Sequence, residues 1–294
     1  MKINSHIQFF YSPSGDGGKP PLYIVKIGGN IIDDEVKLND FLKQFSNINP
    51  PLQGMGANKI LVHGGGKMAT KMAEQMNISQ QVIDGRRITN AETLKIVTMV
   101  YAGYINKNIV AKLQMNNCNA IGLCGADGDA ILAHKRKHPV IDYGYVGDVD
   151  GINSGLIKNL LNQHLTPVFA PITHDQQGQL LNTNADTIAQ ELAKGLSNDF
   201  EVSLIYSFEK NGVLLDADDD STVIPIINPA LYKKLKAKEK IFAGMIPKLD
   251  NAFTALNSGV KKVIIGRTEN LRELIAGTSG TTIQASPNPS EGEA

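Results

Sequence analysis

Two stretches, YIVKIGGN (residues 23–30) and ILVHGGGK (residues 60–67), each join a short apolar run to consecutive glycines. A short apolar run without polar alternation is typical of a strand that is covered on both faces in a parallel sheet. Glycines after such a strand let backbone N–H groups approach a ligand, and a following helix N-terminus adds unpaired donors and a partial positive charge. The alternative is that both stretches are only tight turns, but two clusters at successive strand ends, with Lys26 in the first, favour a phosphate cradle.

Runs of the same kind recur along the chain, with helical periodicity between them; they cover residues 22–27, 60–63, 119–123, 167–172, 202–207 and 262–266. Strands that alternate with helices predict a three-layer αβα sandwich around a largely parallel central sheet. Residues 135–149 (KRKHPVIDYGYVGDV) interrupt this rhythm and predict a hairpin insertion near a site. In an open sheet of this class, ligands bind at the carboxyl ends of the strands.

Local signals predict where several helices begin and end. Thr89 and Glu92 have the spacing of a capping box, and a further helix is expected from about Ala185. Pro247 suits the first turn of another helix, and Thr268 is expected to cap the last one.

Three methionines, Met68, Met72 and Met76, follow one another at four-residue spacing. On a helix they share one face, which we interpret as facing the core rather than a cofactor or a partner.

The composition excludes several classes of protein. The 294 residues carry 29 basic and 29 acidic side chains, so no global field attracts nucleic acid or an anionic membrane. Two cysteines exclude a disulfide scaffold and suit reduced thiols in the cytoplasm, and neither a membrane-spanning run nor a signal core is present. Residues 1–21 and 285–294 are rich in Ser, Gly and Pro and are expected to be flexible tails.

Other site motifs are absent or incomplete. Neither GxxxxGK[ST] nor GxGxxG occurs. The acidic loop at residues 216–220 lacks the glycine and the glutamate of a calcium loop, and His134 and His138 have no third ligand nearby, so no dedicated metal site is expected. The basic run at residues 135–137 is interpreted as solvated surface rather than a nucleic-acid patch.

Five motifs together carry a resemblance: YIVKIGGN, LVHGGGK, VIDGRRIT, LLNTNAD and AGMIPKL, in this order between residues 22 and 283. In this order and spacing they resemble the amino-acid kinase family and, within it, the enzymes that phosphorylate N-acetyl-L-glutamate. The resemblance implies an eight-stranded sheet, an acylglutamate site in residues 22–196 and a nucleotide site in residues 197–284. It also implies transfer of the γ-phosphoryl group of ATP, with Mg²⁺, to the side-chain carboxylate of an N-acyl-L-glutamate, in arginine biosynthesis.

The same resemblance assigns roles to ten residues. Lys26 and Lys248 stabilise the transferring group, and Asp186 orients both lysines. The backbone N–H groups of Gly28 and Gly29 bind the phosphoryl group. The substrate-binding residues are Gly64, Gly65, Arg87, Asn182 and Asn184, with Arg87 taking the α-carboxylate in a bidentate pair. Plainer roles stay open: the lysines could be surface residues, Asp186 a favourable helix N-terminal acid and Asn184 an N-cap.

The chemistry agrees with these assignments because the nucleophile is already an ionised carboxylate and needs no general base. The stretch 206–212 departs from the family, which leaves the nucleotide contacts there open. The resemblance links an extra N-terminal helix to arginine-inhibited hexamers, and residues 1–21 lack helical character, which predicts a homodimer without strong arginine feedback. Two alternatives are an N-succinyl-L-glutamate kinase, whose substrate needs room and a cation for its acyl group, and a non-catalytic amino-acid sensor.

Overall fold

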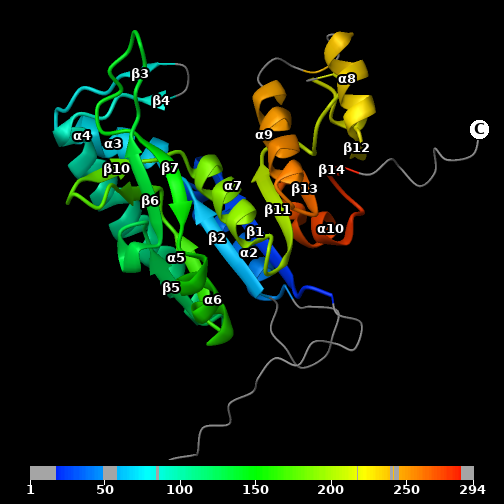
Figure 1. Cartoon of the computed structure of the whole chain (residues 1–294), viewed down its shortest axis with the longest axis horizontal. Helices are drawn as coiled ribbons and strands as arrows, with labels where there is room; N and C mark the ends of the chain where they lie inside the picture. Colours follow the sequence, from blue (N-terminus) through cyan, green and yellow to red (C-terminus); the bar gives the residue numbers. More distant parts are fainter. Residues whose placement is uncertain are drawn as a thin grey trace, which may run out of the picture.

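The computed structural model describes residues 18–48, 58–83, 86–216, 218–238, 241 and 245–285, with the side chain of Pro247 excepted. Almost all of the two expected tails, and with them the expectation about residues 1–21, lies outside these ranges. The described chain is elongated, with β3, β4, β6 and β10 at one end and α8, β12 and β14 at the other (Figure 1).

The strands form one large sheet, a smaller sheet and a short hairpin. The large sheet has the order β12-β14-β13-β11-β1-β2-β8-β5 and contains β1 (Pro21–Ile27), β2 (Asn58–His63), β5 (Ala120–Leu123), β8 (Thr166–Phe169), β11 (Glu201–Phe208), β12 (Ile226–Ile227), β13 (Lys262–Arg267) and β14 (Thr281–Ile283). The smaller sheet has the order β10-β9-β6-β7 and contains β6 (Ile131–Lys135), β7 (Gly147–Ile152), β9 (Ile172–His174) and β10 (Leu180–Asn182). The hairpin pairs β3 (Val82–Ile83) with β4 (Arg86–Arg87).

In the large sheet, every pair from β13 through β11, β1, β2 and β8 to β5 is parallel, and only the β13–β14 pair is antiparallel. The sheet is therefore largely parallel, as predicted. The predicted insertion is the antiparallel hairpin β6–β7. Both β1 and β2 end directly before a glycine cluster, so the register Ile27–His63 places the two clusters side by side.

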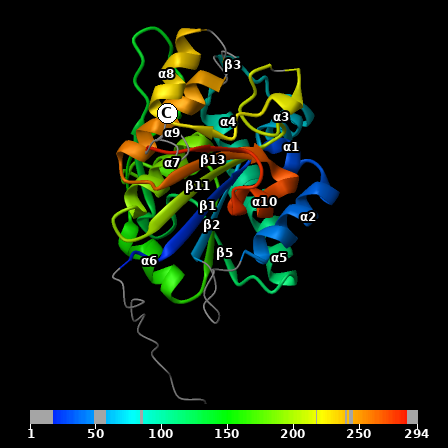
Figure 2. The same ribbon diagram turned by 90° about the vertical axis from the view of Figure 1, so that its right-hand side faces the viewer.

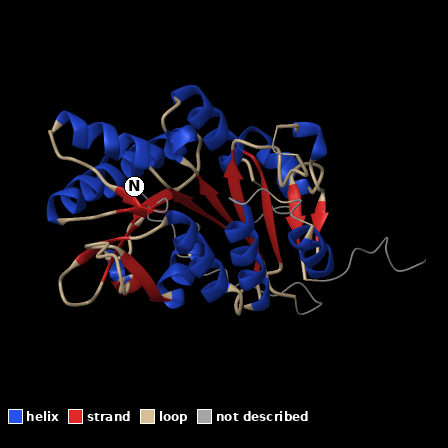
Figure 3. Cartoon of the chain, turned by 90° about the horizontal axis from the view of Figure 1, so that it is seen from above, coloured by secondary structure: helices blue, strands red, loops and turns tan. Residues whose placement is uncertain are grey.

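Helices cover both faces of the large sheet. They are α1 (Gly29–Ile32), α2 (Glu35–Ser46), α3 (Gly66–Gln75), α4 (Ala91–Val97), the π-helix η1 (Thr98–Ile105), α5 (Asn106–Met115), α6 (Ser154–Asn162), α7 (Ala185–Leu196), α8 (Pro229–Ala237), α9 (Ile246–Asn257) and α10 (Leu271–Ala276), with short 3₁₀ turns η2 (Asp127–Asp129), η3 (Asp220–Thr222) and η5 (Thr268–Asn270). Figure 2 shows α2, α5 and α10 on one side of the sheet and α6 and α9 on the other. Seen from above, the strands run between two groups of helices, which confirms the three-layer sandwich (Figure 3).

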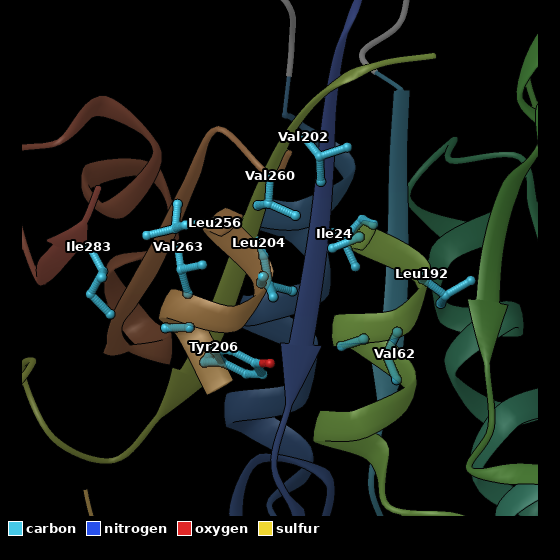
Figure 4. Packing of buried hydrophobic residues seen from close by; sticks show 14 of the residues in the cluster. Ile24, Val62, Leu192, Val202, Leu204, Tyr206, Leu256, Val260, Val263 and Ile283 are labelled. Carbon is cyan, nitrogen blue, oxygen red and sulfur yellow. The ribbon is translucent and has the colours of Figure 1, made fainter. Parts of the chain in front are cut away.

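Two apolar clusters form the core, one on each face of the sheet. Alternate residues of β1 point to opposite clusters, with Leu22 and Ile24 on the α7 side and Val25 and Ile27 on the α2 side. Figure 4 shows part of the first cluster, in which residues of neighbouring strands, such as Ile24 and Leu204, lie together with residues of the covering helices, such as Leu192 and Leu256. All of these side chains are buried, which explains the continuous apolar runs in the sequence.

Four of the local predictions need correction. Asn90, not Thr89, caps α4, because the Asn90 side chain accepts a hydrogen bond from the Thr93 N–H. Thr268 does not cap α10, because its hydroxyl is buried and donates to the Phe208 carbonyl. The expected strand 167–172 is divided between β8 and β9.

The methionine prediction is the fourth. On α3, Ala69 and Ala73 are buried, whereas Met72 and Met76 are exposed. The buried face of the helix is therefore formed by the alanines, and of the three methionines only Met68 packs against the core, where it is partly buried. By contrast, α7 begins at Ala185, and α9 has Pro247 in its first turn, as predicted. None of the described helices is both long and apolar enough to cross a membrane.

Candidate active site

The carboxyl ends of β1 and β2 open into a cavity of about 270 Å³. Nine of the ten predicted site residues line this cavity: Lys26, Gly28, Gly29, Gly64, Gly65, Arg87, Asn182, Asn184 and Asp186. They come from the end of β1, from β4 and β10, and from the turns and first residues of α1, α3 and α7, so one cavity unites motifs that are up to 160 residues apart in the sequence. The tenth residue, Lys248, lies in the first turn of α9.

A carboxylate joins the two predicted lysines. The Nζ atom of Lys26 lies 2.6 Å from Oδ1 of Asp186, with the side chains 16% and 30% exposed. Burial would raise the pKa of Asp186, but the ammonium groups of Lys26 and Lys248 outweigh it and hold this pKa below its ordinary value. Asp186 is therefore an ionised carboxylate that neutralises part of two positive charges.

Lys248 lies near enough to Lys26 and Asp186 for both charges to act on it. Its Nζ lies 5.1 Å from the centroid of the Phe208 ring, a cation–π contact at the end of β11. Burial and the nearby Lys26 charge lower the pKa of Lys248, while Asp186 opposes this shift. A partly desolvated cation gains from an incoming anion, because the anion replaces the lost hydration.

The glycine clusters differ in the donors that they can offer. The N–H group of Gly64 donates to the Ile27 carbonyl at 3.1 Å and so extends the sheet rather than facing a ligand. Gly65 is the N-cap residue of α3, and Gly66 is its first residue, so their N–H groups have no partner within the helix. At Gly65 φ is +154°, and an added Cβ would lie 2.4 Å from Cδ1 of Ile105, so only glycine fits there.

Arg87 faces the cavity while it holds the start of α3. Its Nη2 donates to the Gly66 carbonyl at 2.9 Å and to the Thr70 hydroxyl at 2.8 Å, and its Nη1 donates to Gln80. Arg87 also hydrogen-bonds the side chain of Tyr101, so most of the five guanidinium donors are already used within the protein. A bidentate grip on a carboxylate would replace one of the two Nη2 contacts.

The two asparagines are fixed by the scaffold and keep one polar group each. Asn182 donates through Nδ2 to the Thr89 hydroxyl at 3.0 Å, which leaves its Oδ1. Asn184 caps α7, because its Oδ1 accepts hydrogen bonds from the N–H groups of Asp186 and Thr187, which leaves its Nδ2. The capping role that the sequence suggested for Asn184 is confirmed. Because capping uses only its Oδ1, its Nδ2 can still donate a hydrogen bond into the cavity.

The sequence prediction missed a cation in this cavity. Arg136 lies in the run that was expected to be solvated surface, yet it is only 14% exposed and lines the cavity. Its Nε donates to both oxygens of Asp148 at 3.0 Å, and this contact lowers the pKa of Asp148. Its Nη1 is buried without a hydrogen-bond partner. The sequence did contain a signal for Arg136, because this residue lies in the hairpin insertion that was predicted to be near a site.

Two of the acidic and histidine side chains that the sequence analysis considered as metal ligands have charged or ionisable partners instead. Asp220 accepts from Arg267 at 2.6 Å, and Nδ1 of His134 lies 2.6 Å from Asp150. Across the described residues, no three His, Cys, Asp or Glu side chains come together in a way that could hold a metal ion. Both cysteines are free thiols.

Comparison with known proteins agrees with this geometry. The profile of the Amino acid kinase family matches residues 21–267. The acetylglutamate kinase of Cytophaga hutchinsonii is 56% identical over 255 residues, which are 86% of this chain and 94% of that protein.

Solved structures share the fold. The protein smu.665 from Streptococcus mutans UA159 superposes with a TM-score of 0.73 at 29% identity, covering 90% of this chain and 99% of that one. The carbamate kinase of Giardia lamblia bound to AMP-PNP has a TM-score of 0.65 at 16% identity, covering 92% and 99%, and supports the fold alone.

Proposed function

The chain belongs to the amino acid kinase family, and from this premise we propose that it transfers the γ-phosphoryl group of ATP to the side-chain carboxylate of N-acetyl-L-glutamate. The product is an acyl phosphate, an intermediate of arginine biosynthesis. The feature of the site that supports this proposal most directly is the cluster of Lys26, Asp186 and Lys248 beside two glycine loops.

The geometry suits phosphoryl transfer between two anions. A carboxylate nucleophile and a phosphate repel each other, so the protein must supply positive charge and hold the two groups in line. Lys26 and Lys248 supply the charge from different elements, and Asp186 keeps them from repelling each other. The free N–H groups of Gly65 and Gly66 add fixed dipoles on the α3 side. No residue has to act as a general base.

The nucleotide would lie on the side of Lys248. We assign the acylglutamate site to residues 22–196 and the nucleotide site to residues 197–284, around the ends of β11 and β13. Mg²⁺ would arrive with ATP, held by phosphate oxygens, where it neutralises phosphate charge.

The test is an ADP-release assay with N-acetyl-L-glutamate and ATP. Lys26→Ala and Lys248→Ala should each lower kcat by about 10²–10³-fold, the cost of removing one transition-state donor. Lys95→Ala, an exposed lysine on α4, is the matched control and should leave kcat unchanged. Wild-type protein that binds an acylated glutamate without releasing ADP would instead indicate the amino-acid sensor.

A second substrate has support from Arg136. An N-succinyl group carries a carboxylate where an acetyl group ends in a methyl, and Arg136, a cation that lines the cavity, has a buried Nη1 without a hydrogen-bond partner. Asp148 already neutralises this guanidinium, so acetyl remains the leading assignment. Measuring kcat/KM for both substrates distinguishes the two assignments. A higher kcat/KM for N-succinyl-L-glutamate than for N-acetyl-L-glutamate would make the succinylated compound the assigned substrate.

We also propose a homodimer in the cytoplasm. The exposed side chain of Met72 lies on α3 and that of Met76 directly follows this helix, whereas Met99 and Tyr104 lie on η1, which packs against α3. Apolar side chains gathered on adjacent helices of a charge-balanced protein suit a second copy of the same chain.

A further inference from the structure

A buried histidine stands directly before the second glycine cluster. His63 is fully buried at the end of β2, and its Nδ1 lies 2.8 Å from the carbonyl oxygen of Gly64. A carbonyl can only accept, so Nδ1 carries the proton and Nε2 is an acceptor. Nε2 lies 3.2 Å from Nδ2 of Asn106, which donates to it. Both ring nitrogens are therefore paired in one neutral tautomer.

Burial, and to a lesser degree the charge of Lys107, keeps this ring neutral. Together they lower the pKa of His63 to about 4, although the Gly64 carbonyl opposes the shift. The ring cannot change its hydrogen-bonding pattern in the neutral pH range, so its contact with Gly64 is permanent there.

Asn106 is itself held from three directions. Its Nδ2 also donates to the Val168 carbonyl at 2.9 Å, and its Oδ1 accepts from Lys107 at 3.2 Å. An added Cβ on Gly122 would lie 1.9 Å from this Oδ1, so a glycine is needed on β5 to admit the side chain. Asn106 can therefore fix the orientation of the His63 ring.

The π-helix η1 ends at Ile105, immediately before Asn106. A π-helix has a wider turn than an α-helix and recurs at functional sites. Here the wide turn places Tyr101 and Ile105 against Gly65, while Asn106 contacts His63. One irregular helix thus supports both the ring that holds the glycine loop and the loop itself.

We propose that His63, oriented by Asn106, is a positioning residue that directs the Gly65 N–H toward the transferring phosphoryl group; this rests on the proposed function. The Gly64 N–H is tied to Ile27 and the Gly64 carbonyl to His63. Because a trans peptide is planar, its N–H points opposite to its carbonyl, so fixing the Gly64 carbonyl also fixes the Gly65 N–H. Without this contact, a peptide between two glycines could rotate at little cost.

Two substitutions separate positioning from core packing. In His63→Asn the amide nitrogen can take the place of Nδ1 and keep the bond to Gly64, whereas in His63→Gln it can take the place of Nε2 and lose that bond. We expect His63→Gln to lower kcat about 10–100-fold, with both KM values within about twofold, and His63→Asn to recover most of the loss. Equal losses of kcat in the two variants, or wild-type kcat in His63→Gln, would overturn the proposal.

A measurement without substrate makes the test independent of turnover. Amide hydrogen exchange at residues 65–67 should be faster in His63→Gln than in the wild type and in His63→Asn, and equal rates in all three would refute the positioning role. If the wild type releases no ADP, the proposed function fails while this exchange pattern still tests the contact. Asn106→Ser leaves His63 in place and tests the network should a His63 variant not fold: it should speed the same exchange, and unchanged exchange would count against the proposal.

Discussion

Replacing Asp186 with asparagine tests the charge cluster most sharply, because the two side chains have nearly the same shape. Asp186→Asn removes the negative charge that lies 2.6 Å from Lys26 and that also acts on Lys248. The cap of α7 stays intact, because Asn184 bonds the backbone N–H of residue 186 and not its side chain. The variant therefore leaves two nearby ammonium groups with a neutral amide in place of the carboxylate that offsets their repulsion.

The size of the effect follows from the burial of the pair. Exposed ion pairs contribute about 0.2–1 kcal/mol, and breaking a buried pair costs about 3–5 kcal/mol. With Lys26 16% and Asp186 30% exposed, we expect Asp186→Asn to lower the free energy of unfolding by about 1–3 kcal/mol at pH 7. We expect kcat to fall about 10²–10³-fold, because both lysines lose the group that orients them.

The pH dependence of stability tests whether the pKa of Asp186 is lowered in the folded protein. The folded-state pKa of Asp186 is lowered from 3.8, so its stabilisation is fully present above that value and is lost as the pH falls through the folded pKa. Urea unfolding of both proteins should show a constant difference in free energy between pH 8 and about pH 5, narrowing below about pH 4. A difference that disappears between pH 8 and pH 6 would mean a raised pKa, and wild-type kcat in the variant would refute the orienting role.

Three further substitutions address the binding groups, the loop and the assembly. Arg87→Ala should raise the KM for the acylated glutamate about 10–100-fold and change the KM for ATP little, because hydrogen bonds to charged groups contribute about 1.5–3 kcal/mol. Steady-state kinetics in which the KM for ATP rises instead would place Arg87 outside the amino-acid site. Gly65→Ala should lower the free energy of unfolding, measured in urea, by about 1–3 kcal/mol, because the added Cβ would overlap Ile105. The control is Gly151→Ala, where a Cβ has open space, and it should change this free energy little. Tyr104→Glu, at a side chain that is 64% exposed, should halve the mass measured by light scattering, and an unchanged mass would exclude η1 from the dimer contact.

The parts that the sequence predicted correctly depend on local patterns. Strand ends followed by glycines are visible in single stretches, and the rule that ligands bind at the carboxyl edge then brings Lys26 and Gly65 to one cavity without any knowledge of contacts. Asp186 was found by its motif, and the structure adds its ion pair with Lys26. The αβα layers followed from the alternation of strands and helices.

The features of the fold and the site that the sequence could not predict depend on how closely helices and strands pack against one another. A four-residue period cannot tell the methionine face of α3 from its alanine face, because the space beside the helix decides which one is buried. Asn90 and Thr89 are both good capping residues, and Thr89 is taken instead by contacts with Arg87 and Asn182. His63 and Asn106 are 43 residues apart, and no sequence period links them.

A chain with zero net charge can still bind two anions, because the cavity gathers positive side chains of which only some are neutralised there by carboxylates. Arg136 is neutralised by Asp148, and one carboxylate, Asp186, is shared by Lys26 and Lys248. That sharing leaves one positive charge in excess within the group of Lys26, Asp186 and Lys248, to which Arg87 adds its charge and the N–H groups of Gly65 and Gly66 add their dipoles. Full neutralisation would remove the attraction for phosphate, and no carboxylate would leave two repelling lysines. One aspartate between two lysines meets both requirements, which is why the charge of Asp186, and not merely its shape, should decide the rate.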